Sequence, residues 1–67
     1  MISELDILRT ANILLQNRGA EALSYAAGKA ADFAFKGDQH GALTWKRIVE
    51  GIRELQRLQR GEGEAMH

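Results

Sequence analysis

The sequence of 67 residues contains no cysteine and no proline, and only 6% of its residues are aromatic. Without cysteine, the chain cannot form a disulfide framework or a thiolate metal site, which are the usual supports of a small secreted domain. Nine Lys and Arg balance nine Asp and Glu, so no net charge draws the chain toward nucleic acid, anionic lipid or a cationic partner. No apolar run approaches the length of a membrane span.

The start of the chain also lacks the pattern of a secretory leader. Residues 1–9 have no basic stretch followed by an apolar one. We therefore expect a soluble, uncleaved, cytoplasmic protein that does not bind a membrane. We place a single helical domain at residues 1–61 and a disordered tail at residues 62–67, where His67 is compatible with the start of a purification tag.

A core of this size leaves a monomer only marginally stable. Burial of apolar surface is worth about 100 kcal/mol at ~25 cal/mol/Å², and ordering the chain at ~1.5 kcal/mol per residue costs about the same. Because disulfides and a zinc-type ligand set are lacking, well-packed helices or self-association must supply the margin. A second copy or a binding partner is therefore a physical expectation.

Glycines and capping residues divide the chain into predicted helices at about residues 3–18, 20–36 and 39–60. Ser3 can accept hydrogen bonds from the free amides of the first turn, and Gly19 suits the left-handed conformation that ends a helix. Gly37 ends the second helix in the same way, and Asp38 is the expected cap of the third. No strand pattern is present.

The predicted helices carry more apolar surface than three single stripes. The third has one stripe, with Trp45 as its largest core residue, whereas alanines cover about half of the second and Ile13 lies off the stripe of the first. We therefore predict an all-α fold, either a three-helix antiparallel bundle or a helical hairpin plus an N-terminal helix, completed by a twofold homodimer. The alternative is a monomeric bundle with a few exposed leucines. The residues expected at the dimer or partner interface are Ile7, Ile13, Leu14, Ala27, Ala31 and Phe35.

Few residues offer catalytic or metal-binding chemistry. Asp38 and His40 lie two apart in a turn and could hold a metal ion or pass a proton, but a zinc site needs more ligands than these two. A helix cap is the better interpretation of Asp38. Acid-base catalysis by Glu50 and Glu54 needs a pocket, and both fall on the outer face of the third helix. We therefore expect no enzyme activity, no cofactor and no metal.

A basic arc on the third helix suggests an alternative function. It consists of Lys46, Arg53, Arg57 and Arg60. Doubled in a dimer, it would suit a nucleic-acid-binding regulator, and the second and third helices superficially resemble a helix-turn-helix. However, Glu50 and Glu54 interrupt the arc, and the positive charge lies far from the end that reads bases. A solvated, salt-bridged face is the preferred interpretation.

We assign a structural role to three residues, Asp32, Asp38 and Trp45. Asp32 can pair with Lys36 one turn later. It can also reach across the turn to Arg47 or the Trp45 indole N–H.

Several short motifs are spread over about residues 5–57: Thr10-Ala11-Asn12, Ala31-Asp32, Gly37-Asp38, Trp45-Lys46-Arg47-Ile48 and Ile52-Arg53-Glu54-Leu55. On these motifs the chain resembles a family of short, uncharacterised bacterial helical proteins. The resemblance implies no activity, but it implies that the motifs around Asp32, Asp38 and Trp45 belong to a shared scaffold.

The sequence thus predicts a non-enzymatic interaction protein. We expect an adaptor or inhibitor that self-associates through its first two helices and binds a larger protein. Small inhibitors carried by phages and mobile elements are of this size, although no residue here points to one specifically.

Overall fold

The computed structural model describes residues 3–59, and the prediction of an all-α fold is confirmed for this part of the chain. The elements are α1 (Glu4–Arg18), a 3₁₀ turn η1 (Gly19–Glu21), α2 (Ala22–Phe35) and α3 (Gln39–Gln59). The 3₁₀ turn delays the start of α2 relative to the predicted residue 20. The expected tail at residues 62–67 lies outside the described residues.

Local hydrogen bonds explain where α1 begins and ends. The Ser3 hydroxyl accepts a hydrogen bond from the Asp6 amide at 3.1 Å, and Glu4 and Asp6 place negative charge at the positive end of the helix dipole. At the other end, Gly19 has a φ of 58° and its amide donates to the Leu15 carbonyl. Glycine adopts this positive φ without the steric cost that a side chain would add.

The turn between α2 and α3 is equally well specified. Gly37 has a φ of 84°, its amide donates to the Ala34 carbonyl at 3.1 Å, and the Asp38 amide donates to the Phe33 carbonyl at 2.8 Å. This is the Schellman arrangement that ends many helices. The Asp38 carboxylate then accepts from the Gly41 amide at 2.9 Å, which caps α3.

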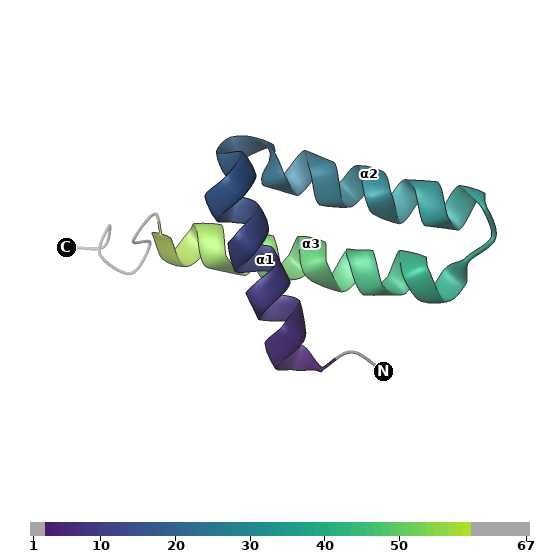
Figure 1. Ribbon diagram of the computed structural model, residues 1–67, viewed down its shortest axis with the longest axis horizontal. Coiled ribbons are helices and arrows are strands. Elements are labelled where there is room, and N and C mark those ends of the chain that lie inside the picture. Colours follow the sequence, from purple (N-terminus) through teal and green to yellow (C-terminus); the bar gives the residue numbers. More distant parts are fainter. Residues whose placement is uncertain (1–2, 60–67) are drawn as a thin grey trace.

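The helices form a hairpin with one crossing helix. α2 and α3 lie side by side and run in opposite directions, while α1 crosses α3 and its first half extends beyond it (Figure 1). α1 therefore packs mainly on α3 and has few contacts with α2.

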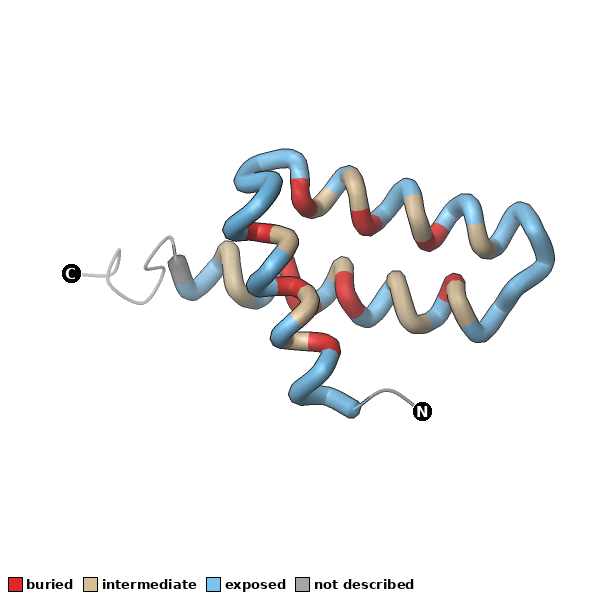
Figure 2. The backbone as a smooth tube through the Cα atoms, viewed as in Figure 1, coloured by how far each residue is buried: buried red, intermediate tan, exposed pale blue. Residues whose placement is uncertain are grey.

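The core lies where the hairpin meets α1. Its buried members are Ile7, Ala11, Leu15, Ala22, Ala26, Ile48 and Ile52. The buried positions of α2 are turned toward α3, and exposed positions lie on the opposite side of α2 (Figure 2). Alanine on the inner side of α2 lets the two hairpin helices approach closely, because helix separation depends on the side chains at the contact.

One expectation about an interface residue was wrong. Ile7 is only 2% exposed, because α1 crosses α3 and that crossing covers it, so it belongs to the core rather than to an interface. Trp45 is half-buried at the edge of the core, and Ile52 is the largest fully buried side chain among the described residues. The indole packs beside Tyr25, with ring centroids 6.1 Å apart and planes at 78°.

Candidate interaction surface

The remaining residues predicted at an interface fall in three different environments. Leu14 is half-buried and packs against the core. Ile13 is 54% exposed on the side of α1 away from α3. Ala27, Ala31 and Phe35 are all exposed and lie together on the outer side of α2. Only this last group forms a shared surface.

The outer side of α2 is uncharged and built almost entirely from small residues. We call it the alanine face; its residues are Ser24, Ala27, Gly28, Ala31, Ala34 and Phe35, all exposed. At 100° per residue they span about 120° of the helix circumference, on the side away from the buried alanines. The Ser24 hydroxyl donates to the Glu21 carbonyl at 3.2 Å, so this polar group is satisfied within its own helix.

The alanine face has a projecting side chain at Phe35 and an open position at Gly28. Phe35 is 93% exposed, the largest exposed fraction among the large hydrophobic side chains of the described residues. A Cβ built on Gly28 would meet no heavy atom within 4 Å, so the face is open at that point. An exposed aromatic side chain beside small residues is a typical anchor for a protein partner.

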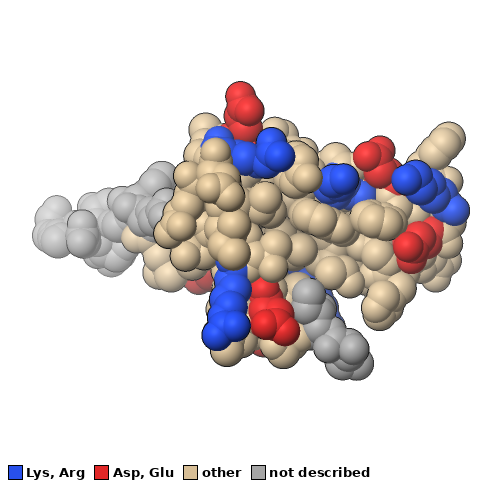
Figure 3. All heavy atoms as spheres, viewed as in Figure 1, with Lys and Arg blue, Asp and Glu red and all other residues tan. Residues whose placement is uncertain are grey.

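Outside the alanine face, Tyr25 of α2 makes aromatic and cation–π contacts. The Arg18 guanidinium lies 3.7 Å from the centroid of the Tyr25 ring, and the Lys29 ammonium lies 5.7 Å from it. These contacts tie the end of α1 to α2 and keep Tyr25 packed on Trp45. On the face of the molecule drawn in Figure 3, charged side chains of both signs are interspersed and uncharged surface lies between them.

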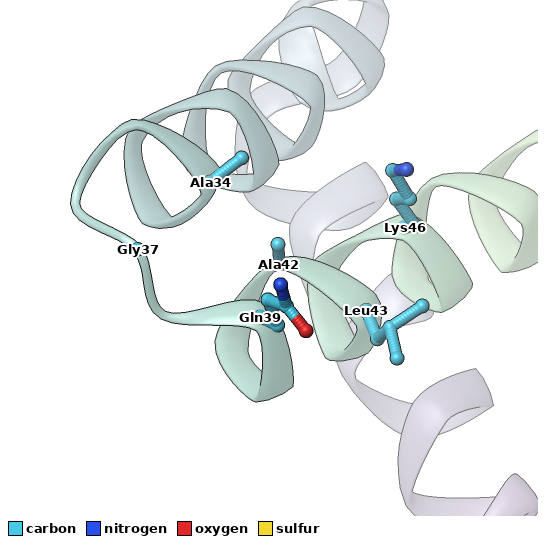
Figure 4. A pocket seen from close by; sticks show the side chains of 6 residues that line it. All are labelled: Ala34, Gly37, Gln39, Ala42, Leu43 and Lys46. Carbon is cyan, nitrogen blue, oxygen red and sulfur yellow. The ribbon is translucent and has the colours of Figure 1, made fainter.

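A hollow of about 380 Å³ adjoins the alanine face at the turn of the hairpin. It is lined by Ala34, Gly37, Gln39, Ala42, Leu43 and Lys46 (Figure 4). Its side chains come from the last turn of α2 and the first turns of α3, and Ala34 belongs to both the hollow and the alanine face. The hollow thus extends the apolar surface of α2 onto α3.

A second hollow of about 490 Å³ lies in the angle between α1 and α3. Glu50 and Glu54 line it together with Glu4, Arg47 and the backbone of Gly51. Helical periodicity predicted Glu50 and Glu54 on an outer face without a pocket, because it does not show that α1 crosses beside them. Both carboxylates are nevertheless exposed.

The basic residues of α3 do not stand alone. Lys46 and Arg53 are exposed, and Arg57 forms an ion pair with Glu54. Arg60 lies outside the described residues. The described part of the arc is therefore bordered by carboxylates, as in a salt-bridged surface helix.

The structural assignments for Asp32 and Asp38 have different outcomes. Asp38 caps α3 through its carboxylate. The Asp32 carboxylate makes no ion pair with Lys36 or Arg47 within residues 3–59; instead its backbone carbonyl accepts from the Lys36 amide at 3.1 Å. Asp32 is exposed, so water solvates its charge without a partner.

Residues 3–59 hold no group of three or more His, Cys, Asp or Glu side chains arranged to bind a metal ion. None of the helices in the described part combines the length and the apolar character needed to cross a membrane.

No protein-family model matches the chain, and neither characterised proteins nor solved structures include one that is detectably similar to it. The resemblance to a family of short bacterial helical proteins therefore stays a prediction.

Proposed function

We propose that this protein is a small, non-enzymatic protein-protein interaction module that binds through the alanine face of α2. The observation that carries the proposal is the position of Phe35, which is almost fully exposed at the end of a helix face that bears no charge. Exposed apolar patches of this kind mark interaction sites on soluble proteins.

The composition of the face favours binding on energetic grounds. Alanine and glycine lose no side-chain entropy when a partner covers them, so ordering the interface costs little. Small side chains also let a partner helix come close to the α2 backbone, which increases dispersion contacts. Phe35 supplies the large apolar side chain that dominates the energy of many interfaces.

An adaptor or inhibitor role fits this surface better than catalysis. The face binds by shape and apolar contact. Its one hydroxyl, that of Ser24, donates to the Glu21 carbonyl without a base beside it, and the face presents no pair of titratable groups. A protein of this kind acts by occupying a surface of a larger protein or by joining two proteins.

The test is affinity capture with the full chain from the cells in which it naturally occurs. We expect the wild-type chain to retain a specific protein and Ala31→Glu to lose it, because the new carboxylate would be buried without a partner. Arg53→Glu, on the exposed side of α3, is the matched control and should still capture that protein. Far-UV circular dichroism should show that both variants keep the helical fold, since both positions are exposed.

Capture of the same protein by the wild-type chain and by Ala31→Glu, at equal levels, would contradict the proposal. Capture of no specific protein by the wild-type chain would contradict it as well, unless a second copy of the chain itself is the partner.

A further inference from the structure

We infer that the alanine face binds the same face of a second copy of this chain, with the two α2 helices antiparallel and related by a twofold axis close to Gly28. This inference rests on the proposed function, because it names a partner for the same surface. Charge, shape and symmetry each support this arrangement.

The position of Gly28 suits a crossing point. It lies near the middle of α2, a helix of 14 residues, and no atom of the chain would touch a Cβ built there. Ala27 and Ala31 flank it on the same exposed side. Because Gly28 has no side chain, the backbones of two copies can come close together at this point.

The charges beside the face are complementary in the antiparallel arrangement. Glu21 precedes the first residue of α2 and Lys36 follows the last, and both are exposed. If the α-helical spacing of 100° per residue is continued to Glu21, the last residue of η1, the two lie within about 60° of each other on the same flank of the face, and exposed Asp32 lies between them in angle. In an antiparallel helix pair equal flanks meet, so Glu21 of each copy lies opposite Lys36 of the other.

A parallel pair lacks this match. It brings opposite flanks together, so that Glu21 of one copy lies nearer to Leu23 of the other than to Lys36. It also aligns the two helix dipoles in the same direction, whereas the antiparallel pair sets opposite partial charges side by side.

The shape of the face is also self-complementary, with a large side chain at one end and small residues at the other. Phe35 lies at the C-terminal end of α2. Ser24 in the first turn of α2 and Ala20 in the preceding η1 turn are small and exposed at the other end. In the antiparallel pair Phe35 of each copy covers these small residues of the other. A twofold axis makes each contact twice and uses the same surface on both chains. No such surface is left to bind a third chain, so the assembly is closed at two chains.

The dimer is expected to be weak. A helix of 14 residues is about 21 Å long at 1.5 Å per residue, so one helix pair buries less than the ~800 Å² per partner of a standard interface. We therefore expect a concentration-dependent equilibrium between monomer and dimer.

The first test is sedimentation equilibrium of the full chain at concentrations from about 10 µM to about 1 mM. The wild-type chain should shift toward the mass of a dimer as its concentration rises, and Ala31→Glu should remain a monomer. Arg53→Glu is the control that should dimerise like the wild type.

Charge exchange tests the antiparallel geometry directly. Glu21→Lys alone and Lys36→Glu alone each place like charges opposite each other at both ends of the homodimer, and each should weaken it by about tenfold. An equimolar mixture of the two variants restores opposite charges at both ends. The mixture should therefore form a heterodimer about as readily as the wild-type chain forms a homodimer.

Covalent cross-linking tests the position of the axis. Because the chain has no cysteine, Gly28→Cys introduces a single thiol, which a short bismaleimide should join to the same thiol of the second copy. Asp6→Cys, on an exposed position of α1, is the control and should give no covalent dimer at equal concentration.

The possible failures are distinguishable from those of the proposed function. A wild-type chain that stays monomeric over the whole range overturns this inference only; the proposed function then depends on whether Ala31→Glu loses a captured protein. A dimer that Ala31→Glu leaves intact overturns the inference by placing the interface elsewhere. A dimer that is lost in Ala31→Glu, but shows neither heterodimer recovery nor Gly28→Cys cross-linking, overturns the antiparallel geometry.

Discussion

Gly51 of α3 lies directly against Ala11 of α1, so that a Cβ built on Gly51 would be 3.3 Å from the Ala11 Cβ. Side-chain atoms of Ile7 and Leu8 lie 3.6 and 3.7 Å from the same point. The crossing of α1 over α3 therefore depends on the absence of a side chain at this position, and it covers the buried residues of α1.

Replacement of this glycine should loosen the crossing. We expect Gly51→Leu to lower the free energy of unfolding by about 1–3 kcal/mol, because the added atoms overpack the contact with Ala11. Urea unfolding followed by circular dichroism measures the change. Arg53→Leu adds the same side chain on the exposed side of α3 and should change stability by no more than about 0.5 kcal/mol. Equal effects of the two substitutions would contradict the close approach.

Loss of the Asp38 cap should destabilise the hairpin. Asp38→Ala removes the acceptor for the Gly41 amide and should lower the free energy of unfolding by about 1 kcal/mol, a typical value for an N-cap. Asp38→Asn keeps an oxygen acceptor and is the matched control. The same urea unfolding experiment measures both variants. A stability of Asp38→Ala equal to that of the wild type would show that the cap contributes nothing.

Phe35 and Ile52 should separate binding from folding. Ile52 is fully buried, so Ile52→Ala should lower the free energy of unfolding by about 2–5 kcal/mol. Phe35→Ala should change it by no more than about 0.5 kcal/mol at low micromolar concentration, below the range in which we expect two copies to associate, because the ring is almost fully exposed. The same variant should weaken the association of two copies in sedimentation equilibrium. A large loss of monomer stability in Phe35→Ala would mean that the ring belongs to the core.

The basic residues of α3 should not make the chain a nucleic-acid-binding protein. Glu50 and Glu54 lie on the exposed side of the same helix and offset Lys46 and Arg53. We expect no salt-dependent binding to a labelled duplex of unrelated sequence in fluorescence anisotropy at low ionic strength. Binding that falls steeply with added salt and disappears in Arg53→Glu would favour the alternative function instead.

The sequence was most informative where a local rule applies. Gly19, Gly37 and Asp38 occupy helix ends that few other residues satisfy, since a positive φ favours glycine and an N-cap needs a short acceptor. Ala27 and Ala31 were also predicted at an interface, because apolar residues cover more of the second helix than one buried stripe needs, and both are exposed.

The sequence was least informative about which helix covers which face. Periodicity placed Ile7 on an apolar arc but could not show that α1 crosses α3 and buries it. The signal that could have found the crossing is Gly51, a glycine inside a helix, which often marks a close approach of another backbone. Without that crossing, the position of Glu50 and Glu54 beside a hollow could not be inferred either.

Asp38 closes α2 through its amide and starts α3 through its carboxylate, so the same residue serves both helices. The turn consequently contains no spare residue. One amino acid inserted before Asp38 would break the hydrogen bonds that end α2, and one inserted after it would break the cap of α3. Either insertion would rotate α3 relative to the alanines of α2. Variation in chain length, whether natural or engineered, is therefore best accommodated outside this connection.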